Sequence, residues 1–222
     1  LPTPDSVQKI VFTPGGQLWH SFGNQLATIT YADSVWPGDA DDDGIANHFD
    51  ILALGQAFGS TGTSRPNPSL NWVGQYAPLW FNQLPNGTDY CFSDTDGSGT
   101  VDFDDTLAVN LNFGLMHNRP SGKLSQSGVP IYLQPQNAPV QAGDTLTLDV
   151  MLGTDSFPAN EVYGLGFDIS YDPSLVDSGK IWFSYEGSWL GQKNTDLITI
   201  DKDFYTEGKM SMGLSRINQI NQ

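Results

Sequence analysis

Two acidic stretches carry oxygen-bearing residues at every second position, a spacing that suits a hard metal ion. They begin at Asp39 and Asp94, and each has a glycine, Gly44 or Gly99, at its sixth position. Calcium takes six to eight oxygens from loop positions 1, 3, 5, 7, 9 and 12, and the glycine permits the sharp turn that points them inward. The sequence therefore predicts two bound Ca²⁺ ions. The expected ligands are Asp39, Asp41, Asp43, Ile45 (backbone carbonyl), Asn47 and Asp50 in the first loop, and Asp94, Asp96, Ser98, Thr100 (backbone carbonyl), Asp102 and Asp105 in the second.

The two stretches are copies within an internal repeat of 55 residues. Each loop leads into about ten helix-compatible residues and a glycine stop, Gly59 or Gly114. In the second copy, Phe103, Leu107 and Leu111 stand four apart and predict one apolar helix face. The alternative, an acidic turn with helix N-caps, explains single aspartates but not this spacing twice. Magnesium suits the loops less well, because it needs a tighter octahedral shell.

Acidic residues dominate the charge, with 25 Asp and Glu against 9 Lys and Arg and a formal charge of −16. Such a surface repels nucleic acid and anionic lipid, because both bind through Lys and Arg. No apolar run is long enough to insert in a membrane. The chain opens with Leu-Pro-Thr-Pro, which we interpret as a processed mature chain or a fragment, and we expect a secreted, extracellular or cell-surface location. The single cysteine, Cys91, is either a small apolar core residue or a reactive or partner-linked thiol.

No catalytic constellation is recognisable in the sequence. The three histidines, His20, His48 and His117, lie far apart and match no zinc motif. A nucleophile elbow and a phosphate- or dinucleotide-binding glycine motif are both absent. A glycosidase would need a carboxylate pair, but most clustered carboxylates here are assigned to calcium. We therefore expect a protein that is not an enzyme.

The segment between the two repeats, residues 60–93, is rich in proline, asparagine and aromatic residues. Its aromatic side chains are expected either to pack over the two short helices, which are too small to supply a core alone, or to form a platform for a glycan or another partner. Asn86 begins a formal N-glycosylation sequon, which makes a glycoprotein possible in principle. The aromatic residues in question are Trp72, Tyr76, Trp80 and Phe81.

From Val129 onward the apolar pattern changes to a period of two residues. Residues 163–171 alternate almost perfectly, which predicts a strand with one buried face, and residues 146–152 alternate in the same way. Turn-forming residues separate these runs, so the second half reads as an antiparallel β-sandwich and the whole chain as α+β. Further strands are expected at 181–185, 197–200 and 210–214.

The paired loops, with Asp rather than Glu at position 12 and one helix after each, resemble the dockerin family. The resemblance covers roughly Val35 to His117, although dockerins usually join their loops by a shorter linker than the insert 60–93. Val35-Trp-Pro-Gly-Asp39 and the tryptophans of the insert look like a dockerin-like subfamily of large secreted bacterial surface proteins. The resemblance implies calcium-dependent folding and attachment to a scaffold domain.

The second half resembles the cohesin-like sandwich, the family that partners dockerins, in residues 142–149, 162–176 and 187–191. Fewer residues remain than such a sandwich usually has, so we expect its last strands to be missing. Three explanations stay open. The sequence is a fragment, or the apolar segments 10–12 and 26–31 complete the sheet, or they complete the sheet of the next copy by strand donation, which would build a filament.

These patterns predict four segments. They are an extended or strand segment (1–34), a dockerin-like calcium domain with its insert (35–118), a linker (119–128) and an incomplete cohesin-like sandwich (129–222). The expected function is a non-catalytic, calcium-stabilised structural subunit of an extracellular assembly, with other copies of itself as partners in a filament. The alternative is a dockerin-like anchor that attaches a larger secreted protein to a scaffold domain or a glycan.

Overall fold

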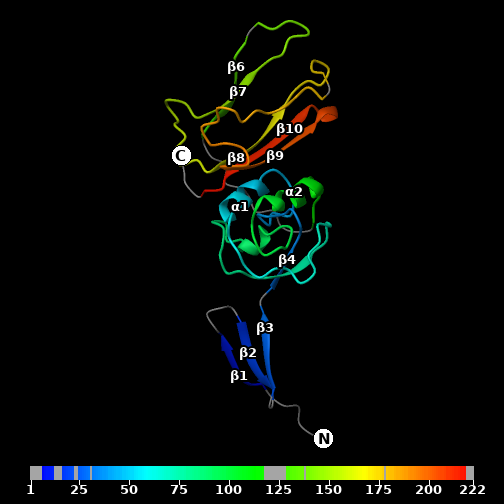
Figure 1. The fold of residues 1–222 in the computed structure, drawn as a ribbon, viewed down its shortest axis with the longest axis vertical. Helices are drawn as coiled ribbons and strands as arrows, with labels where there is room; N and C mark the ends of the chain where they lie inside the picture. Colours follow the sequence, from blue (N-terminus) through cyan, green and yellow to red (C-terminus); the bar gives the residue numbers. More distant parts are fainter. Residues whose placement is uncertain are drawn as a thin grey trace. The chain divides into compact units, whose positions relative to one another are not determined.

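The computed structural model describes residues 7–12, 17–22, 25–30, 32–117, 129–137, 139–177 and 179–218. These residues form a mixed α+β fold with two α-helices and ten strands in four sheets (Figure 1). The chain divides into two compact units, Leu1–Gly122 with Tyr163–Ile220, and Lys123–Val162 with Asn221–Gln222. This division differs from the predicted boundary at residue 129, because the chain from Tyr163 onward packs with the first half. No helix in the described ranges is long and apolar enough to cross a membrane.

The first three strands form a sheet of their own. Strands β1 (Val7–Phe12) and β3 (Gln25–Thr30) each pair antiparallel with the middle strand, β2 (Gln17–Phe22). The segments 10–12 and 26–31, considered as completing strands for the second half, therefore pair with β2 in the described part of this chain, and Tyr31 lies outside that part. Strand β4 (Ala32–Val35) then pairs with β5 (Gln75–Pro78) and ties the start of the first acidic loop to the insert.

Each acidic loop leads into a short helix. Helix α1 covers Asp50–Ala57, and α2 covers Thr106–Asn112 after a 3-10 turn, η2 (Phe103–Asp105). The helices are eight and seven residues long, shorter than predicted. Each ends before an extended phenylalanine, which is followed by a glycine with positive φ, 78° at Gly59 and 82° at Gly114. Glycine adopts this conformation at little cost, so the predicted glycine stops are confirmed.

The two loop–helix units hold each other through matching backbone hydrogen bonds. Gly59 N–H donates to Val101 O (2.8 Å), and its counterpart Gly114 N–H donates to Ala46 O (2.7 Å). The chain that leaves each helix thus pairs with the loop of the other unit. The same exchange recurs in the bridges Thr61–Thr100 and Ile45–Met116, which are again related by the 55-residue repeat.

Helix α1 packs on one face of an antiparallel sheet that has the strand order β8 (Gly164–Ser170), β10 (Lys209–Arg216) and β9 (Leu197–Phe204). Glycines on this face leave room for the helix, because a Cβ on Gly166 would overlap the Phe49 ring and one on Gly213 would overlap the His48 carbonyl. Tyr163 Oη also donates to Gly55 O in α1 (2.8 Å). The shared core consists of Ala40, Ile51, Ala53, Leu54, Ala57, Leu84, Val101, Val109, Ile198 and Ile200.

The opposite face of this sheet carries the apolar side chains of the alternating pattern. Phe167 makes an edge contact with Phe183 (6.4 Å between ring centroids), and Arg216 Nη1 donates to Leu190 O (2.7 Å). Residues 181–185, predicted as a strand, are therefore irregular chain lying over the sheet. Along β8 the apolar side chains are half-buried and Asp168 and Ser170 on the other face are exposed, but Gly164 and Gly166 on that other face also lie against residues in and just before α1, which the sequence did not predict.

The second compact unit contains one described hairpin. Strand β6 (Ile131–Pro135) pairs antiparallel with β7 (Leu148–Leu152), which begins two residues later than the alternating run predicted. The side chains of β6 are exposed. The remaining 3-10 turns of the chain are η1 (Tyr90–Phe92) and η3 (Tyr205–Glu207).

The predicted apolar face of α2 points away from the core. Phe103, Leu107 and Leu111 are 37%, 46% and 59% exposed, whereas the buried side of the helix is formed by Ala108 and Val109. The sequence correctly predicted an apolar stripe on this helix but did not show that the stripe is exposed.

The aromatic side chains of the insert differ in burial. Trp72 and Trp80 are half-buried, while Tyr76 and Phe81 are exposed, so the four do not act as one group. Cys91 is buried with Val35, Ala77 and Phe92.

Candidate metal centres

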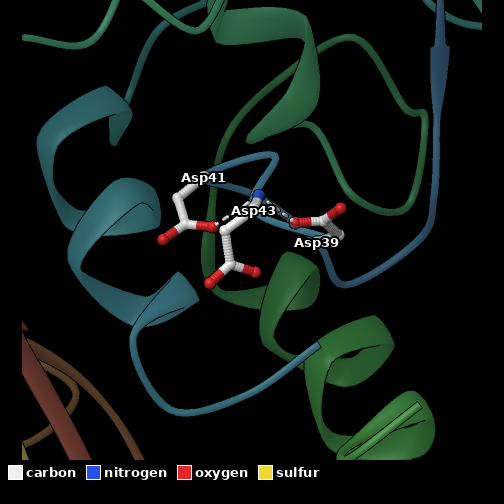
Figure 2. Close-up of side chains that lie close together, drawn as sticks. All are labelled: Asp39, Asp41 and Asp43. Carbon is white, nitrogen blue, oxygen red and sulfur yellow. Dashed lines mark hydrogen bonds between the residues drawn. The ribbon is translucent and has the colours of Figure 1, made fainter. Parts of the chain in front are cut away.

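The first acidic loop brings three carboxylates together just before α1. One carboxylate oxygen from each of Asp39, Asp41 and Asp43 lies within 4.8 Å of the others (Figure 2). Asp39 and Asp41 are buried, and Asp43 is half-buried. A cation between these three side chains could take one oxygen from each, so the cluster could hold a metal ion.

The second loop also groups three carboxylates, but they come from positions 1, 3 and 12, whereas those of the first loop come from positions 1, 3 and 5. Carboxylate oxygens of Asp94, Asp96 and Asp105 lie within 4.8 Å of one another, and Asp105 comes from the turn that begins α2. Asp94 Oδ1 is buried and has no hydrogen-bond partner within the described chain. A buried carboxylate oxygen without a donor is costly unless a cation faces it, so this atom fits a metal ligand.

Position 12 closes each loop onto its own beginning. Asp50 is fully buried, and its Oδ1 accepts hydrogen bonds from Ala40 N–H (2.5 Å) and Asp41 N–H (3.2 Å). Its Oδ2 accepts from Asn47 N–H (2.7 Å). A carboxylate here therefore organises the loop backbone even before it contacts an ion. The second loop repeats these bonds from Asp96 N–H (3.0 Å) and Asp102 N–H (2.8 Å) to Asp105.

The glycine at position 6 plays the same part in both loops. Gly44 N–H donates to Asp39 Oδ2 (3.1 Å), and Gly99 N–H donates to Asp94 Oδ2 (3.1 Å). Both loops take positive φ at the same two positions, which turns the chain so that every second side chain lies on the inside of the loop. The φ values are 62° for Asp42 and 82° for Gly97 at position 4, and 96° for Gly44 and 94° for Gly99 at position 6.

The remaining predicted ligands make local hydrogen bonds within the loops. Asn47 Nδ2 donates to Ile45 O (3.2 Å), and Asn47 Oδ1 accepts from Phe49 N–H (2.7 Å). Ile45 O and Asn47 Oδ1 therefore already accept hydrogen bonds from neighbouring residues, so they would have to reorient to bind an ion. The counterparts in the second loop are Ser98 Oγ to Thr100 O (3.2 Å) and Asp104 N–H to Asp102 Oδ1 (2.8 Å).

Burial of so many carboxylates favours their protonated forms when no cation is near. Burial, and then repulsion by Asp43 and Asp39, raises the pKa of Asp41 to about 7. Burial raises the pKa of Asp94 to about 6 and that of Asp105 to about 8. A divalent cation would remove this penalty, because it favours the ionised carboxylates.

The sequence reasoning missed a histidine beside the first loop. His117 Nε2 lies 2.7 Å from Asp39 Oδ2, and the imidazole stacks on Trp36 (4.5 Å between ring centroids). The repeat relates position 117 to Gly62, so the sequence shows no second histidine that could have drawn attention to His117. His117 N–H donates to Gly44 O (2.9 Å), as Gly62 N–H donates to Gly99 O (3.0 Å) in the other unit.

An arginine from the insert lies beside the second loop. Arg65 is buried, and its Nη2 donates to Thr95 O (2.5 Å) while its backbone N–H donates to Gly97 O (3.1 Å). Burial lowers the pKa of Arg65, while the nearby carboxylates, Asp94 foremost, raise it. The sequence pattern gave no signal for this residue, because Arg65 lies outside the repeated loop.

His48, Asp168 and Ser211 lie together at the contact between α1 and the sheet. Ser211 Oγ donates to Asp168 Oδ1 (2.6 Å), and His48 Nε2 lies 3.9 Å from the same oxygen. In a hydrolase the serine must contact the histidine, whereas here both contact the aspartate. Ser211 is also 1% exposed, so no substrate could reach it. This group is therefore structural.

Comparison with protein-family models, curated proteins and solved structures found no match to this chain.

Proposed function

We propose that this chain is a non-catalytic, calcium-stabilised structural subunit of a secreted or cell-surface assembly made of copies of itself, with one Ca²⁺ in each acidic loop. The observation that carries the calcium part is the matched scaffold of the loops. Each has grouped carboxylates, positive φ at positions 4 and 6, and a buried aspartate at position 12 that binds the loop backbone.

The donor chemistry favours calcium over other divalent ions. The grouped atoms are carboxylate oxygens, which are hard donors, and the predicted set adds backbone carbonyls and hydroxyl or amide oxygens. Zinc would favour nitrogen or sulfur ligands in a tetrahedral arrangement, and magnesium would keep much of its water. A loop that offers up to six oxygens along twelve residues suits the larger and less demanding calcium ion.

Calcium acts as a folding cofactor in this proposal. The carboxylates of each cluster repel one another and are buried, so the folded state without metal is disfavoured at neutral pH. An ion that binds only the folded state adds its binding free energy to stability.

The assembly part of the proposal rests on two surfaces. The first is the contact of α1 with the β8–β10–β9 sheet within one chain, which supports the proposal that a dockerin-like unit and a cohesin-like sheet pair with each other. We propose that the β8–β10–β9 sheet belongs to an incomplete cohesin-like sandwich, and that the pairing of such a sheet with a loop–helix unit also links copies. The second surface is the exposed stripe of α2.

The stripe of α2 is supported by the internal repeat. Leu107 is the counterpart of Leu52, whose side chain packs against Gly164 of the sheet, yet Leu107 is 46% exposed. An apolar helix face whose repeat-related partner is covered by protein suits a contact with a second copy of the chain.

Negative-stain microscopy of the purified chain with millimolar calcium, and again after EDTA, tests the assembly. We expect fibres that dissolve on chelation. The double change Leu107→Asp and Leu111→Asp should abolish fibres without changing the melting temperature, whereas Val140→Asp, another exposed apolar position, should leave them intact. Dispersed particles in calcium for the parent chain would contradict the assembly and favour the dockerin-like anchor, which is then tested by retention on immobilised sandwich domains or polysaccharide.

A further inference from the structure

The two calcium loops have matching scaffolds but different neighbours. Beside the second loop, Arg65 is 3% exposed, a rare state for an arginine without a carboxylate partner. It forms no ion pair within 4.0 Å among the described residues, although Asp94, Asp105 and Asp96 all act on its charge. Its guanidinium is therefore close to the cluster without neutralising any one ligand.

The position of Arg65 is built into the fold. Its side chain donates to Thr95 O, and its backbone N–H donates to Gly97 O, so it contacts loop positions 2 and 4 from outside. A Cβ on residue 97 would overlap the Arg65 guanidinium, so glycine at this position leaves the space that the guanidinium occupies. Nε and Nη1 are buried and have no hydrogen-bond partner in the described chain, which makes the buried position costly for stability.

A buried arginine without an ion-pair partner needs another interaction to offset the cost of burying its charge. The negative charge of the nearby carboxylate cluster supplies that interaction. We infer that Arg65 is a resident cation of the second loop, which holds that loop together when calcium is absent and lowers its calcium affinity when calcium binds. This inference rests on the proposed calcium sites. Arginine keeps its charge at any physiological pH, so the effect is permanent rather than switched.

The two consequences follow from the same charge. Without calcium, the guanidinium offsets part of the repulsion among the Asp94, Asp96 and Asp105 carboxylates. With calcium, it repels the ion across a partly buried gap, an effect on the order of tenfold in affinity. Removing the charge should therefore tighten calcium binding at the second loop and loosen that loop in the calcium-free protein.

Site-specific NMR of the full chain tests this. Gly44 and Gly99 N–H each donate to the position-1 aspartate of their own loop, so their amide shifts report the two sites separately during a calcium titration. In Arg65→Gln, the Gly99 midpoint should fall to a calcium concentration about tenfold lower, while the Gly44 midpoint stays unchanged. Arg65→Lys keeps the charge and loses the planar fork, so its Gly99 midpoint should stay near that of the parent.

The outcomes separate the two ideas. A Gly99 midpoint that rises or does not move in Arg65→Gln, or moves equally in Arg65→Lys, would overturn the inference and leave the calcium sites standing. No calcium response in the parent chain would overturn the proposed function itself. Should Arg65→Gln fail to fold, hydrogen exchange of the parent in EDTA decides, because the inference requires the Gly99 and Asp102 amides to be better protected than their counterparts Gly44 and Asn47 in the first loop, and equal protection would overturn it.

Discussion

The aspartate at position 12 of the first loop offers the sharpest test of how the loop works, because it acts both on the backbone and on the proposed ion. Asp50 accepts hydrogen bonds from the Ala40, Asp41 and Asn47 backbone N–H groups while it is fully buried. Asp50→Ala removes all three acceptors. Asp50→Asn keeps one acceptor oxygen and the shape of the side chain but removes the charge.

The magnitude follows from these contacts. A buried donor left without its acceptor costs about 1–3 kcal/mol, and since neighbouring losses are not additive, three donors cost about 3–6 kcal/mol in Asp50→Ala. For a domain of this size that corresponds to a melting temperature roughly 10–20 °C lower, with or without calcium. Asp50→Asn loses only the acceptor for Asn47, so without calcium it should cost about 1–3 kcal/mol.

Calcium separates the two roles. The parent chain should gain melting temperature when calcium is added, and Asp50→Asn should lose much of that gain because its first loop no longer offers a charged ligand at position 12. Thermal melts followed by circular dichroism in EDTA and in millimolar calcium measure both effects. Asp155→Ala, an exposed aspartate outside the loops, is the matched control and should behave as the parent. Identical calcium gains in the parent and Asp50→Asn would mean that the Asp50 carboxylate does not bind the ion.

Two further predictions concern pH and packing. Without calcium, stability should fall as pH rises from near 3.8 to about 8, because burial raises the pKa values of Asp41, Asp94 and Asp105 above their unfolded values and the native state then binds more protons. In saturating calcium the slope should reverse, with stability lost as pH falls, because protons compete with the ion; melts across pH 5 to 8 with the same slope in both conditions would contradict this. Gly213→Ala places a methyl group against the His48 carbonyl and should lower the free energy of unfolding by about 1–3 kcal/mol, measured by urea denaturation, whereas no change would mean that α1 does not lie on the glycine face.

The two acidic clusters were predictable because the residue pattern that forms them is local. Ligand spacing, the glycine turn and the 55-residue repeat all lie within short stretches, and the structure groups Asp39, Asp41 and Asp43 as that spacing implies. Their neighbours were not predictable from spacing. Arg65 and His117 reach the loops from segments outside the repeated motif, and only the exchanged pairing of the two units brings them there.

The second half shows that a two-residue apolar period predicts a strand but not which elements pack against its two faces. The alternation of residues 163–171 predicted β8 well, yet it also suggested that the glycine side was the open one. Glycines such as Gly166 instead mark the closest approach of another element, here Phe49 at the start of α1. Residues 181–185 carry the same apolar pattern, but Phe183 uses it to cover the sheet from outside.

The apolar stripe on α2 gives a related example of a pattern that predicts an element but not its contacts. Leu107 and Leu111 obey the helical period, and the sequence holds no information on whether such a face meets the core or remains exposed for another molecule.

Isothermal titration calorimetry of the chelator-treated full chain with calcium measures the proposed binding itself. We expect two Ca²⁺ ions per chain, reduced to one by Asp39→Ala in the first loop and to one by Asp94→Ala in the second. An absence of binding heat, together with a melting temperature that calcium does not raise, would mean that the loops do not bind calcium.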